Sequence, residues 1–181
     1  MIYLAIPNTG TIKTELMEWV LRNPCNHMIM PQLKPHDHNR NYIVQEFLKT
    51  DCTHLMMIDS DVVPVSDVRK MVDNDVDICS AHVCTRLGNE IIPVGMTKNE
   101  NGYHHDFKHS KPDLHKVDAV GTGCIMIHRR VFEKLEKPYF KFVYNDDGML
   151  ICGEDFYFSN RIDSVYFDSR FACKHFTVTA I

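Results

Sequence analysis

Short apolar runs alternate with amphipathic stretches through the first half of this chain. The runs are bounded by turn-forming residues, such as Pro7–Gly10 after the first run, as is typical of buried strands. Between the runs, apolar side chains recur at helical spacing, as Ile12, Leu16 and Val20 do. Strand and helix in alternation predict an α/β fold with a mostly parallel central sheet. The predicted strands are residues 3–6, 27–30, 54–58 and 78–83, and the predicted helices end at Leu21, Lys49 and Val72 after caps at Thr11, Asn39 and Ser66.

The second half of the chain has a different pattern. Residues 97–116 are polar and rich in histidine, which predicts a loop that lies in solvent or forms a lid over an acceptor. Residues 31–38 are also predicted to be an irregular loop. No repeat, low-complexity tract or linker divides the chain, so we expect a single domain. The predicted elements of this half are strands over residues 91–96, 117–120, 124–128 and 165–167, and helices over residues 129–136 and 153–162.

The bulk composition narrows the class of protein. The 181 residues are enough for one full core, and 44% hydrophobic and 24% charged residues are typical of a soluble globule. No apolar run approaches the ~20 residues of a membrane span, and a net charge of −4 gives no general attraction to nucleic acid or anionic membrane. The 7 cysteines include no Cys-x-x-Cys pair, which argues against a zinc ribbon and suits a reducing cytoplasm.

The third predicted strand, His54–Ile58, ends in the sequence Asp59-Ser60-Asp61. Open α/β sheets bind ligands at the carboxyl ends of their strands. On an extended segment, residues two apart point the same way, so both carboxylates can reach one divalent cation. Because a strand end of this kind can also simply begin a turn, the rest of the chain has to decide between the two.

Further motifs follow one another along the chain, and together they resemble the GT-A glycosyltransferases, in particular small family-2-like members. In that family an Asp-x-Asp motif follows two strand–helix units, as Asp59-Ser60-Asp61 does here. The resemblance covers most of the chain. The other matching segments are Pro7-Asn8-Thr9 after the first strand, Arg40-Asn41 at the start of the second helix, Gly121-Thr122-Gly123 before a strand and helix, Gly153-Glu154-Asp155 at the start of a late helix, and His175.

The resemblance implies a fold, a division of the chain and an activity. The fold is a Rossmann-like αβα sandwich, with a nucleotide-binding half at about residues 1–65 and an acceptor half at about residues 66–181. The activity is transfer of a sugar from a UDP- or GDP-sugar donor to a hydroxyl of a glycan or small-molecule acceptor. Because the acceptor half is short, a homo-oligomer could complete it. A nucleic-acid acceptor is not favoured, since the chain has no basic stripe.

The resemblance also implies a metal site. Asp61 would bind a divalent cation directly, Asp59 would contact the ribose or bind the cation through water, and His175 would be the distant ligand. Hard oxygen ligands suit Mg²⁺ or Mn²⁺, and an added imidazole favours Mn²⁺. For Asn8, a role in the turn stays as open as a contact with the nucleobase. The implied donor-binding residues are Pro7, Asn8, Thr9, Arg40, Asp59, Ser60, Asp61, Gly121, Thr122 and Gly123.

Two acidic residues are the catalytic candidates. Asp155 is the candidate general base, which would remove the proton of the acceptor hydroxyl as its oxygen attacks the anomeric carbon from the opposite face. That reaction is a single displacement with inversion, whereas a retaining mechanism would need no base there. Glu154 would bind acceptor hydroxyls. Carboxylates in the first turn also stabilise a helix, so capping explains both residues as well.

Other classes of protein share part of this pattern. A phosphatase of the haloacid-dehalogenase type also uses a strand that ends in Asp-x-Asp, with Asp59 as nucleophile and Asp61 as general acid. In that family the motif closes the first strand, whereas here two strand–helix units precede it. A catalytically inactive nucleotide-sugar-binding module would keep the fold without turnover. A nucleotidyltransferase is disfavoured, because Pro7–Gly10 is not the glycine-rich basic loop expected there.

Overall fold

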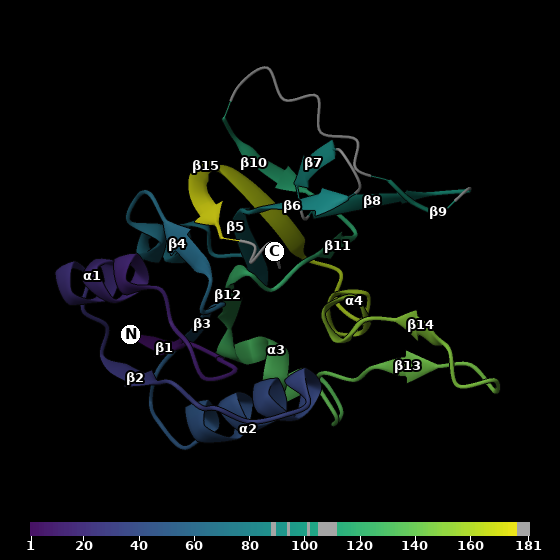
Figure 1. Cartoon of the computed structure of the whole chain (residues 1–181), viewed down its shortest axis with the longest axis horizontal. Helices are drawn as coiled ribbons and strands as arrows, with labels where there is room; N and C mark the ends of the chain where they lie inside the picture. The colour runs from purple at the N-terminus through teal and green to yellow at the C-terminus, as the bar shows by residue number, and fades with distance from the viewer. Residues whose placement is uncertain (88–89, 94, 101, 105–111, 177–181) are drawn as a thin grey trace.

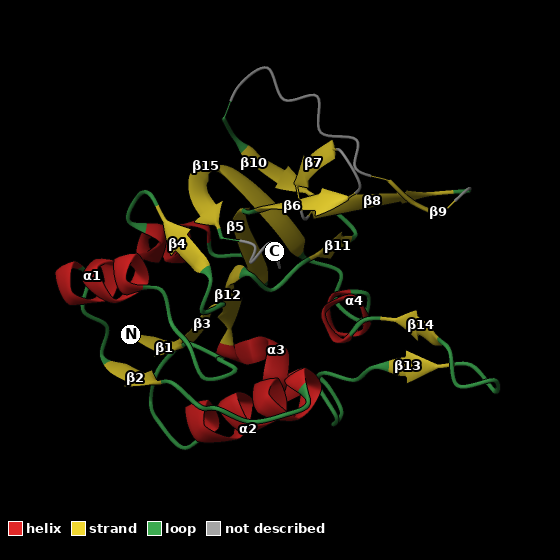
Figure 2. Cartoon of the chain, viewed as in Figure 1, coloured by secondary structure: helices red, strands yellow, loops and turns green. Residues whose placement is uncertain are grey.

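The computed structural model describes residues 1–87, 90–93, 95–100, 102–104 and 112–176. In this part of the chain, helices lie on both faces of one large β-sheet (Figure 1), and strands and helices mix throughout (Figure 2). The predicted α/β class is therefore confirmed. No helix among these residues is long and apolar enough to cross a bilayer. The helices are α1 (Thr14–Arg22), α2 (His36–Leu48), α3 (Arg129–Lys134) and α4 (Glu154–Ser159), with the 3₁₀ helix η1 (Val68–Asn74).

The large sheet combines parallel and antiparallel strands. Its members are β1 (Ile2–Ala5), β2 (His27–Ile29), β3 (His54–Ile58), β4 (Val62–Pro64), β5 (Ile78–His82), β10 (Leu114–Lys116), β12 (Cys124–His128) and β15 (Val165–His175). Their order is β10-β15-β5-β12-β3-β1-β2, and β4 pairs with the end of β15. β1 is parallel to β2 and β3, as the sequence predicts, and β5 is parallel to β15. β12 runs antiparallel between β3 and β5, so it begins at the carboxyl end of β3.

Alternate side chains of the central strands enter two separate cores. In β3, Met56 lies in one core, whereas its neighbours Leu55 and Met57 lie in the other. One core packs against α2, α3 and α4, with Phe47 of α2 fully buried in it. The other packs against α1, β4 and η1. Because helices cover both faces, neither face of these strands can be polar, which explains their uninterrupted apolar runs.

β15 changes partners part-way along its length. Residues 165–168 run parallel to β5, the register then shifts so that Ala172 pairs with His82 of β5, and residues 173–175 pair with β4. The shift is held by Asp168, whose fully buried carboxylate accepts hydrogen bonds from Arg170 Nε at 2.8 Å and Asn74 Nδ2 at 2.9 Å. The bend takes the end of β15 away from β5 and towards the segment that follows β3.

Short antiparallel strands surround the large sheet. β13 (Val143–Tyr144) and β14 (Leu150–Cys152) form a hairpin that projects from the body of the molecule just before α4 (Figure 1). The others are β6 (Cys84–Leu87) paired with β7 (Glu90–Pro93), and β8 (Gly95–Asn99) between β9 (Gly102–His104) and β11 (Ala119–Val120). The Tyr103 ring contacts the Phe156 ring with centroids 5.6 Å apart, so this second group lies beside α4.

The start of α2 corrects the predicted loop over residues 31–38. The helix begins at His36, because Pro35 before it has an extended backbone and a fixed φ that suits a helix start. Asn39 is therefore inside the helix and is not its cap. Its side-chain amide donates to the Pro31 carbonyl at 3.1 Å.

Two other caps are also displaced. α1 begins at Thr14, with Lys13 and not Thr11 in the cap position. η1 follows Asp67 and not Ser66, and the Asp67 carboxylate accepts from a backbone N–H of the first turn. More than one polar residue stands near each helix start, so local chemistry does not decide which of them occupies the cap position.

Strand pairing overturns two further predictions. β15 extends to His175, well beyond the predicted strand over residues 165–167, because its second half finds a partner in β4. Residues 97–116 are not one loop, since they contain the end of β8, all of β9 and all of β10. Residues 101 and 105–111 of the predicted lid lie outside the described residues.

Replacing Asp168 by alanine is expected to lower the free energy of unfolding by about 2–4 kcal/mol, because the bend of β15 loses a buried acceptor. Burial opposes the charge of Asp168, but the hydrogen bonds from Arg170 and Asn74 outweigh it and lower its pKa. This stabilisation is therefore present at neutral pH and is lost as the pH falls through that lowered pKa. Chemical denaturation at two pH values measures both effects.

Asp67→Ala is the matched control for Asp168→Ala. Asp67 pairs with Arg69 in the same i, i+2 arrangement, but both side chains are part-exposed, so we expect a loss of only about 1 kcal/mol. Equal losses at the two sites would contradict the role given to the buried bend.

Candidate functional site

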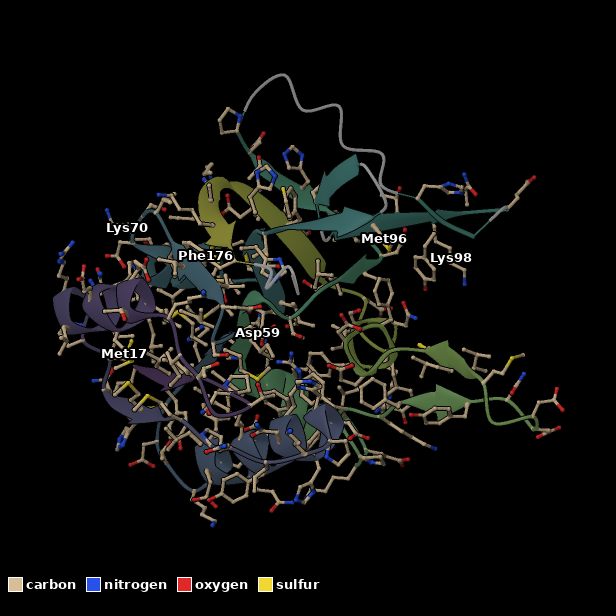
Figure 3. The ribbon with its side chains drawn as sticks, in the orientation of Figure 1. Met17, Asp59, Lys70, Met96, Lys98 and Phe176 are labelled. Carbon is tan, nitrogen blue, oxygen red and sulfur yellow. The ribbon has the colours of Figure 1, made fainter. Side chains whose placement is uncertain are left out.

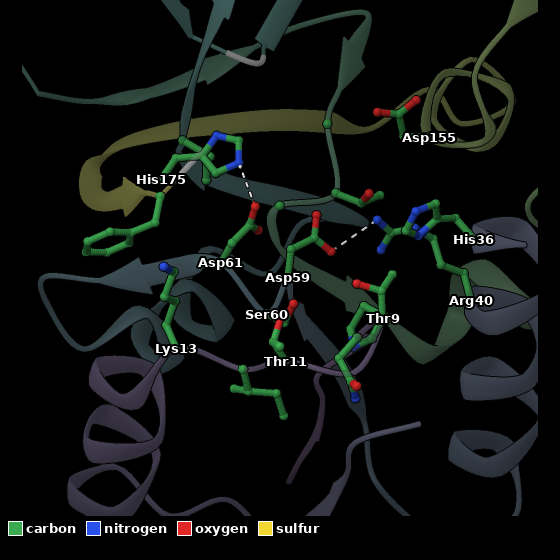
Figure 4. Close-up of a pocket in the computed structure, with 18 of the residues that line it drawn as sticks. Thr9, Thr11, Lys13, His36, Arg40, Asp59, Ser60, Asp61, Asp155 and His175 are labelled. Atoms are coloured by element: carbon green, nitrogen blue, oxygen red, sulfur yellow. Dashed lines mark hydrogen bonds and ion pairs between the residues drawn. The ribbon is translucent and has the colours of Figure 1, made fainter. Parts of the chain in front are cut away.

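A cavity of about 1230 Å³ opens at one edge of the large sheet. Its lining comes from the loop after β1, the carboxyl end of β3, the segment before β12, the end of β15 and the starts of α1, α2 and α4. Asp59 lies near the middle of the molecule in the side-chain view (Figure 3) and at the centre of the cavity in close-up (Figure 4). Ligands bind at this edge of open α/β sheets.

Every residue that the sequence nominated lines this cavity. Two backbone contacts explain how distant segments meet there. The Asp59 N–H donates to the Gly123 carbonyl at 2.9 Å, and the Phe176 N–H donates to the Asp61 carbonyl at 2.8 Å. The nominated residues in the lining are Pro7, Asn8, Thr9, Arg40, Asp59, Ser60, Asp61, Gly121, Thr122, Gly123, Glu154, Asp155 and His175.

Arg40 of α2 is a buried charge that joins two carboxylates. Its Nη2 donates to Asp59 Oδ1 at 3.1 Å and its Nε to Glu154 Oε1 at 3.2 Å, while only 5% of its side chain is exposed. Burial disfavours the charge, but Asp59 and Glu154 outweigh it and raise the pKa of Arg40. Its buried Nη1 finds no acceptor among the described residues. The guanidinium thus keeps one buried N–H group without an acceptor in this part of the chain.

Asp61 and His175 face each other on the side of Asp59 that is opposite Arg40 (Figure 4). Asp61 Oδ2 lies 3.4 Å from His175 Nε2, and His175 Nδ1 lies 2.9 Å from the carbonyl oxygen of Cys84. Because a carbonyl can only accept, Nδ1 carries a proton and Nε2 is the nitrogen presented to Asp61. The hydrogen bond from His175 lowers the pKa of Asp61, and the same contact raises the pKa of His175.

Asp155 lies in the first turn of α4, away from the Asp61–His175 pair. Burial, with the negative charge of Glu154 in addition, raises the pKa of Asp155 to about 6. Its Oδ1 accepts the Phe156 N–H at 2.8 Å. A Cβ on Gly153 would lie 2.9 Å from that oxygen, so a glycine there leaves room for the carboxylate. A carboxylate with a raised pKa is suited to proton transfer.

Asn8 holds the loop after β1 to the next loop of the sheet. Its Nδ2 donates to the carbonyls of Met30 at 3.1 Å and Pro31 at 3.3 Å, and its Oδ1 accepts the Gly10 N–H at 3.1 Å. The side chain thus fills the turn role that the sequence left open. Contact with a nucleobase stays a prediction.

The cavity also includes residues that the sequence analysis missed. Lys13 precedes α1, and its Nζ lies 5.2 Å from the centre of the Phe176 ring. His36 lines the cavity at the start of α2. Lys174, beside His175, is exposed and is not part of the lining, because alternate residues of a strand face opposite ways. Lys13 could have been predicted from the sequence, because it is a basic residue just before the helix that follows the first strand.

Among the described residues, no group of three or more His, Cys, Asp and Glu side chains is gathered as a ready-made cation site. Asp61 and His175 fit a divalent ion as a pair of ligands. Two adjacent ligands ~2.1 Å from one ion lie ~3 Å apart, and Asp61 Oδ2 and His175 Nε2 are 3.4 Å apart. Asp59 has one oxygen engaged by Arg40, and its role towards a metal stays a prediction.

No family model matches this chain, and no curated protein matches its sequence. Among solved structures, A197 from STIV aligns over 98% of this chain and 86% of its own length, with a TM-score of 0.77 and 19% identity. The two chains have the same fold. At this level of identity, the likeness shows the fold alone.

Transferases are also found among the structures that align at low identity. A glycosyltransferase involved in the glycosylation of the major capsid of PBCV-1 covers 76% of this chain and 69% of its own, with 15% identity and a TM-score of 0.41. A putative glucose-1-phosphate thymidylyltransferase from Bacillus anthracis covers 93% of this chain and 87% of its own, with 11% identity and a TM-score of 0.49. Both scores are too low to assign either activity to this chain.

Arg40→Met is expected to lower the free energy of unfolding at pH 7 by about 3–5 kcal/mol, because it leaves Asp59 and Glu154 facing each other without their shared partner. The loss should shrink at acid pH, where protonation removes the repulsion between the two carboxylates. Denaturant titrations at both pH values measure this difference.

Arg22→Met provides the comparison for Arg40→Met. Arg22 pairs with Glu18 on the exposed face of α1, where an ion pair contributes about 0.5 kcal/mol or less. A loss at Arg40 as small as that at Arg22, or one that does not vary with pH, would contradict the assigned role.

Proposed function

We propose that this chain is a metal-dependent glycosyltransferase that moves a sugar from a nucleotide-sugar donor to an acceptor hydroxyl. The observation that carries the proposal is that Asp59-Ser60-Asp61, His175 and Asp155 line the same cavity. It offers an acid–imidazole pair on one side and a carboxylate with a raised pKa on the other. Sugar transfer from a diphosphate requires stabilisation of the leaving group and a base for the acceptor, which these two sides would supply.

The charge of the cavity supports a role for a divalent cation. Carboxylates outnumber cationic side chains in its lining, so a diphosphate alone would be repelled. Asp61 and His175 would hold the ion, Mn²⁺ in preference to Mg²⁺, with Asp59 on the ribose or on the ion through water. When bound, the ion neutralises the charge of the departing nucleoside diphosphate. Lys13 stands near Asp61 and adds positive charge on that side.

The donor would lie along the loops that line the cavity. Pro7-Asn8-Thr9 would meet the nucleoside of a UDP- or GDP-sugar, and Gly121-Thr122-Gly123 would lie under the sugar. Arg40 would bind a donor oxygen through its remaining nitrogen, which has no acceptor among the described residues. Because Arg40 is already paired with Asp59 and Glu154, we assign it hydrogen bonding and positioning and not neutralisation of the diphosphate.

Asp155 would act as the general base of an inverting transfer. The proton of the acceptor hydroxyl passes to Asp155 as the acceptor oxygen bonds to the anomeric carbon and the bond from that carbon to the diphosphate breaks. Glu154 accepts from Arg40 through Oε1, which fixes the carboxylate and leaves its other oxygen for an acceptor hydroxyl. The acceptor would be a glycan or a small molecule.

Binding of UDP or GDP is expected to raise the melting temperature only in the presence of Mn²⁺ or Mg²⁺. In Asp61→Ala, metal affinity should fall by roughly 10–100-fold, and the nucleotide-dependent rise should disappear at moderate metal concentration. A thermal-shift screen with calorimetry measures both quantities. Glu18→Ala, on the exposed face of α1, is the control and should behave like wild type. Nucleotide binding that is independent of metal and unchanged in Asp61→Ala would contradict the role of Asp61 as a metal ligand.

Asp155→Asn is expected to keep donor binding and to lower the transfer rate by ~10²–10⁴-fold, because an amide is not a base. The wild-type kcat/KM should rise with pH through about 6, since Asp155 must lose its proton to act as the base. That rise should be absent in the variant. NMR of the wild-type product should show an inverted anomeric configuration, and a retained one would remove Asp155 from this role.

The alternatives give different results in the same assays. A phosphatase that uses Asp59 as nucleophile would release phosphate from an aryl phosphate without needing a nucleotide. A catalytically inactive binding module would show the metal-dependent thermal shift but no turnover of any donor.

A further inference from the structure

Exposed apolar side chains are concentrated on the β13–β14 hairpin, which projects from the body of the molecule (Figure 1). Tyr144 is 56% exposed, Met149 63%, Leu150 53% and Ile151 64%. Among the described strands, β13 and β14 pair only with each other. A lone two-stranded hairpin is marginally stable in water, and its edges can accept further strands. The hairpin therefore has the properties of a contact surface.

The two ends of this hairpin carry opposite charges. Its turn, residues 145–148, contains Asp146 and Asp147, both exposed. The segment at its root, residues 134–141, carries an excess of lysine. The exposed charged residues of that segment are Lys134, Lys137 and Lys141, against Glu136. On the other side of the root, Glu154 and Asp155 are only partly exposed and line the cavity, and Glu154 is paired with Arg40. The exposed charge is thus negative at the tip and positive along the segment that leads into β13.

We propose that the β13–β14 hairpin is the contact between two copies of this chain. Two hairpins related by a two-fold axis perpendicular to their length run in opposite directions, so in this arrangement the acidic tip of each lies beside the lysines at the root of the other. The same arrangement brings the apolar side chains of the two hairpins together. One interface therefore covers the apolar patch and pairs both sets of charges.

The charge pattern favours a second copy over a membrane. Asp146 and Asp147 are at the tip, so insertion of the apolar hairpin would carry two carboxylates towards the hydrocarbon, which is costly. A second copy already has the complementary lysines at the required end. Gly153 is the single residue between β14 and α4, so the contact would also steady the helix start that carries Glu154 and Asp155. The inference concerns assembly and stands apart from the proposed reaction.

Sedimentation velocity over a range of concentrations tests this inference with charge-reversed variants. Wild type should shift from the 21.0 kDa monomer to a dimer as its concentration rises. The tip variant Asp146→Lys/Asp147→Lys and the root variant Lys137→Glu/Lys141→Glu should each weaken the dimer roughly tenfold or more, because like charges then meet at both contacts. Mixing the two variants should restore a dimer. The reversed tip of one variant then meets the reversed root of the other, and the unchanged tip meets the unchanged root, so both contacts again join opposite charges.

The apolar contact is tested with Leu150→Lys/Ile151→Lys, which should be monomeric with an unchanged circular dichroism spectrum. Leu21→Lys is its control, because Leu21 is a 79% exposed apolar residue on α1 and its replacement should leave the dimer intact. The proposal is overturned if the wild type stays monomeric at every concentration. This includes the case in which the monomer sediments with lipid vesicles. It is also overturned by a dimer that survives both charge reversals, or by variants that do not recover on mixing.

Discussion

The burial of one positive charge, that of Arg40, constrains the whole site. A guanidinium with 5% of its side chain exposed has to be paired, and its partners come from the carboxyl end of β3 and the start of α4. Arg40 and Glu154 are 114 positions apart in sequence. Their pairing sets α2, β3 and α4 around one cavity, because each carboxylate must lie within hydrogen-bonding distance of the same planar group.

The central sheet completes the cavity through two departures from a parallel arrangement. β12 enters antiparallel, which places the Gly121–Gly123 segment beside Asp59. β15 shifts register on β5 after the buried Asp168 and then pairs with β4 from Cys173 onwards, which places His175 opposite Asp61. A purely parallel sheet would have left both segments elsewhere. The irregular part of the sheet is therefore the part that builds the site.

Two carboxylates in the same cavity are held in opposite electrostatic settings. The hydrogen bond from His175 lowers the pKa of Asp61, which keeps that group charged and suited to a cation. Burial raises the pKa of Asp155 to about 6, which makes it a stronger base. Under the proposed function, these two environments would let one cavity hold a cation at Asp61 and move a proton at Asp155.

The sequence by itself determined the α/β class and the central strands, and its motifs nominated residues that line the cavity, though not Lys13 or His36. Apolar runs such as His54–Ile58 are buried on both faces, so their pattern is local and readable, and the Asp59-Ser60-Asp61 motif marks the end of one such run. Tertiary structure alone decided the antiparallel direction of β12 and the length of β15. These features depend on which strand or carboxylate a segment meets, and such partners are distant in sequence and leave no periodic signal in it.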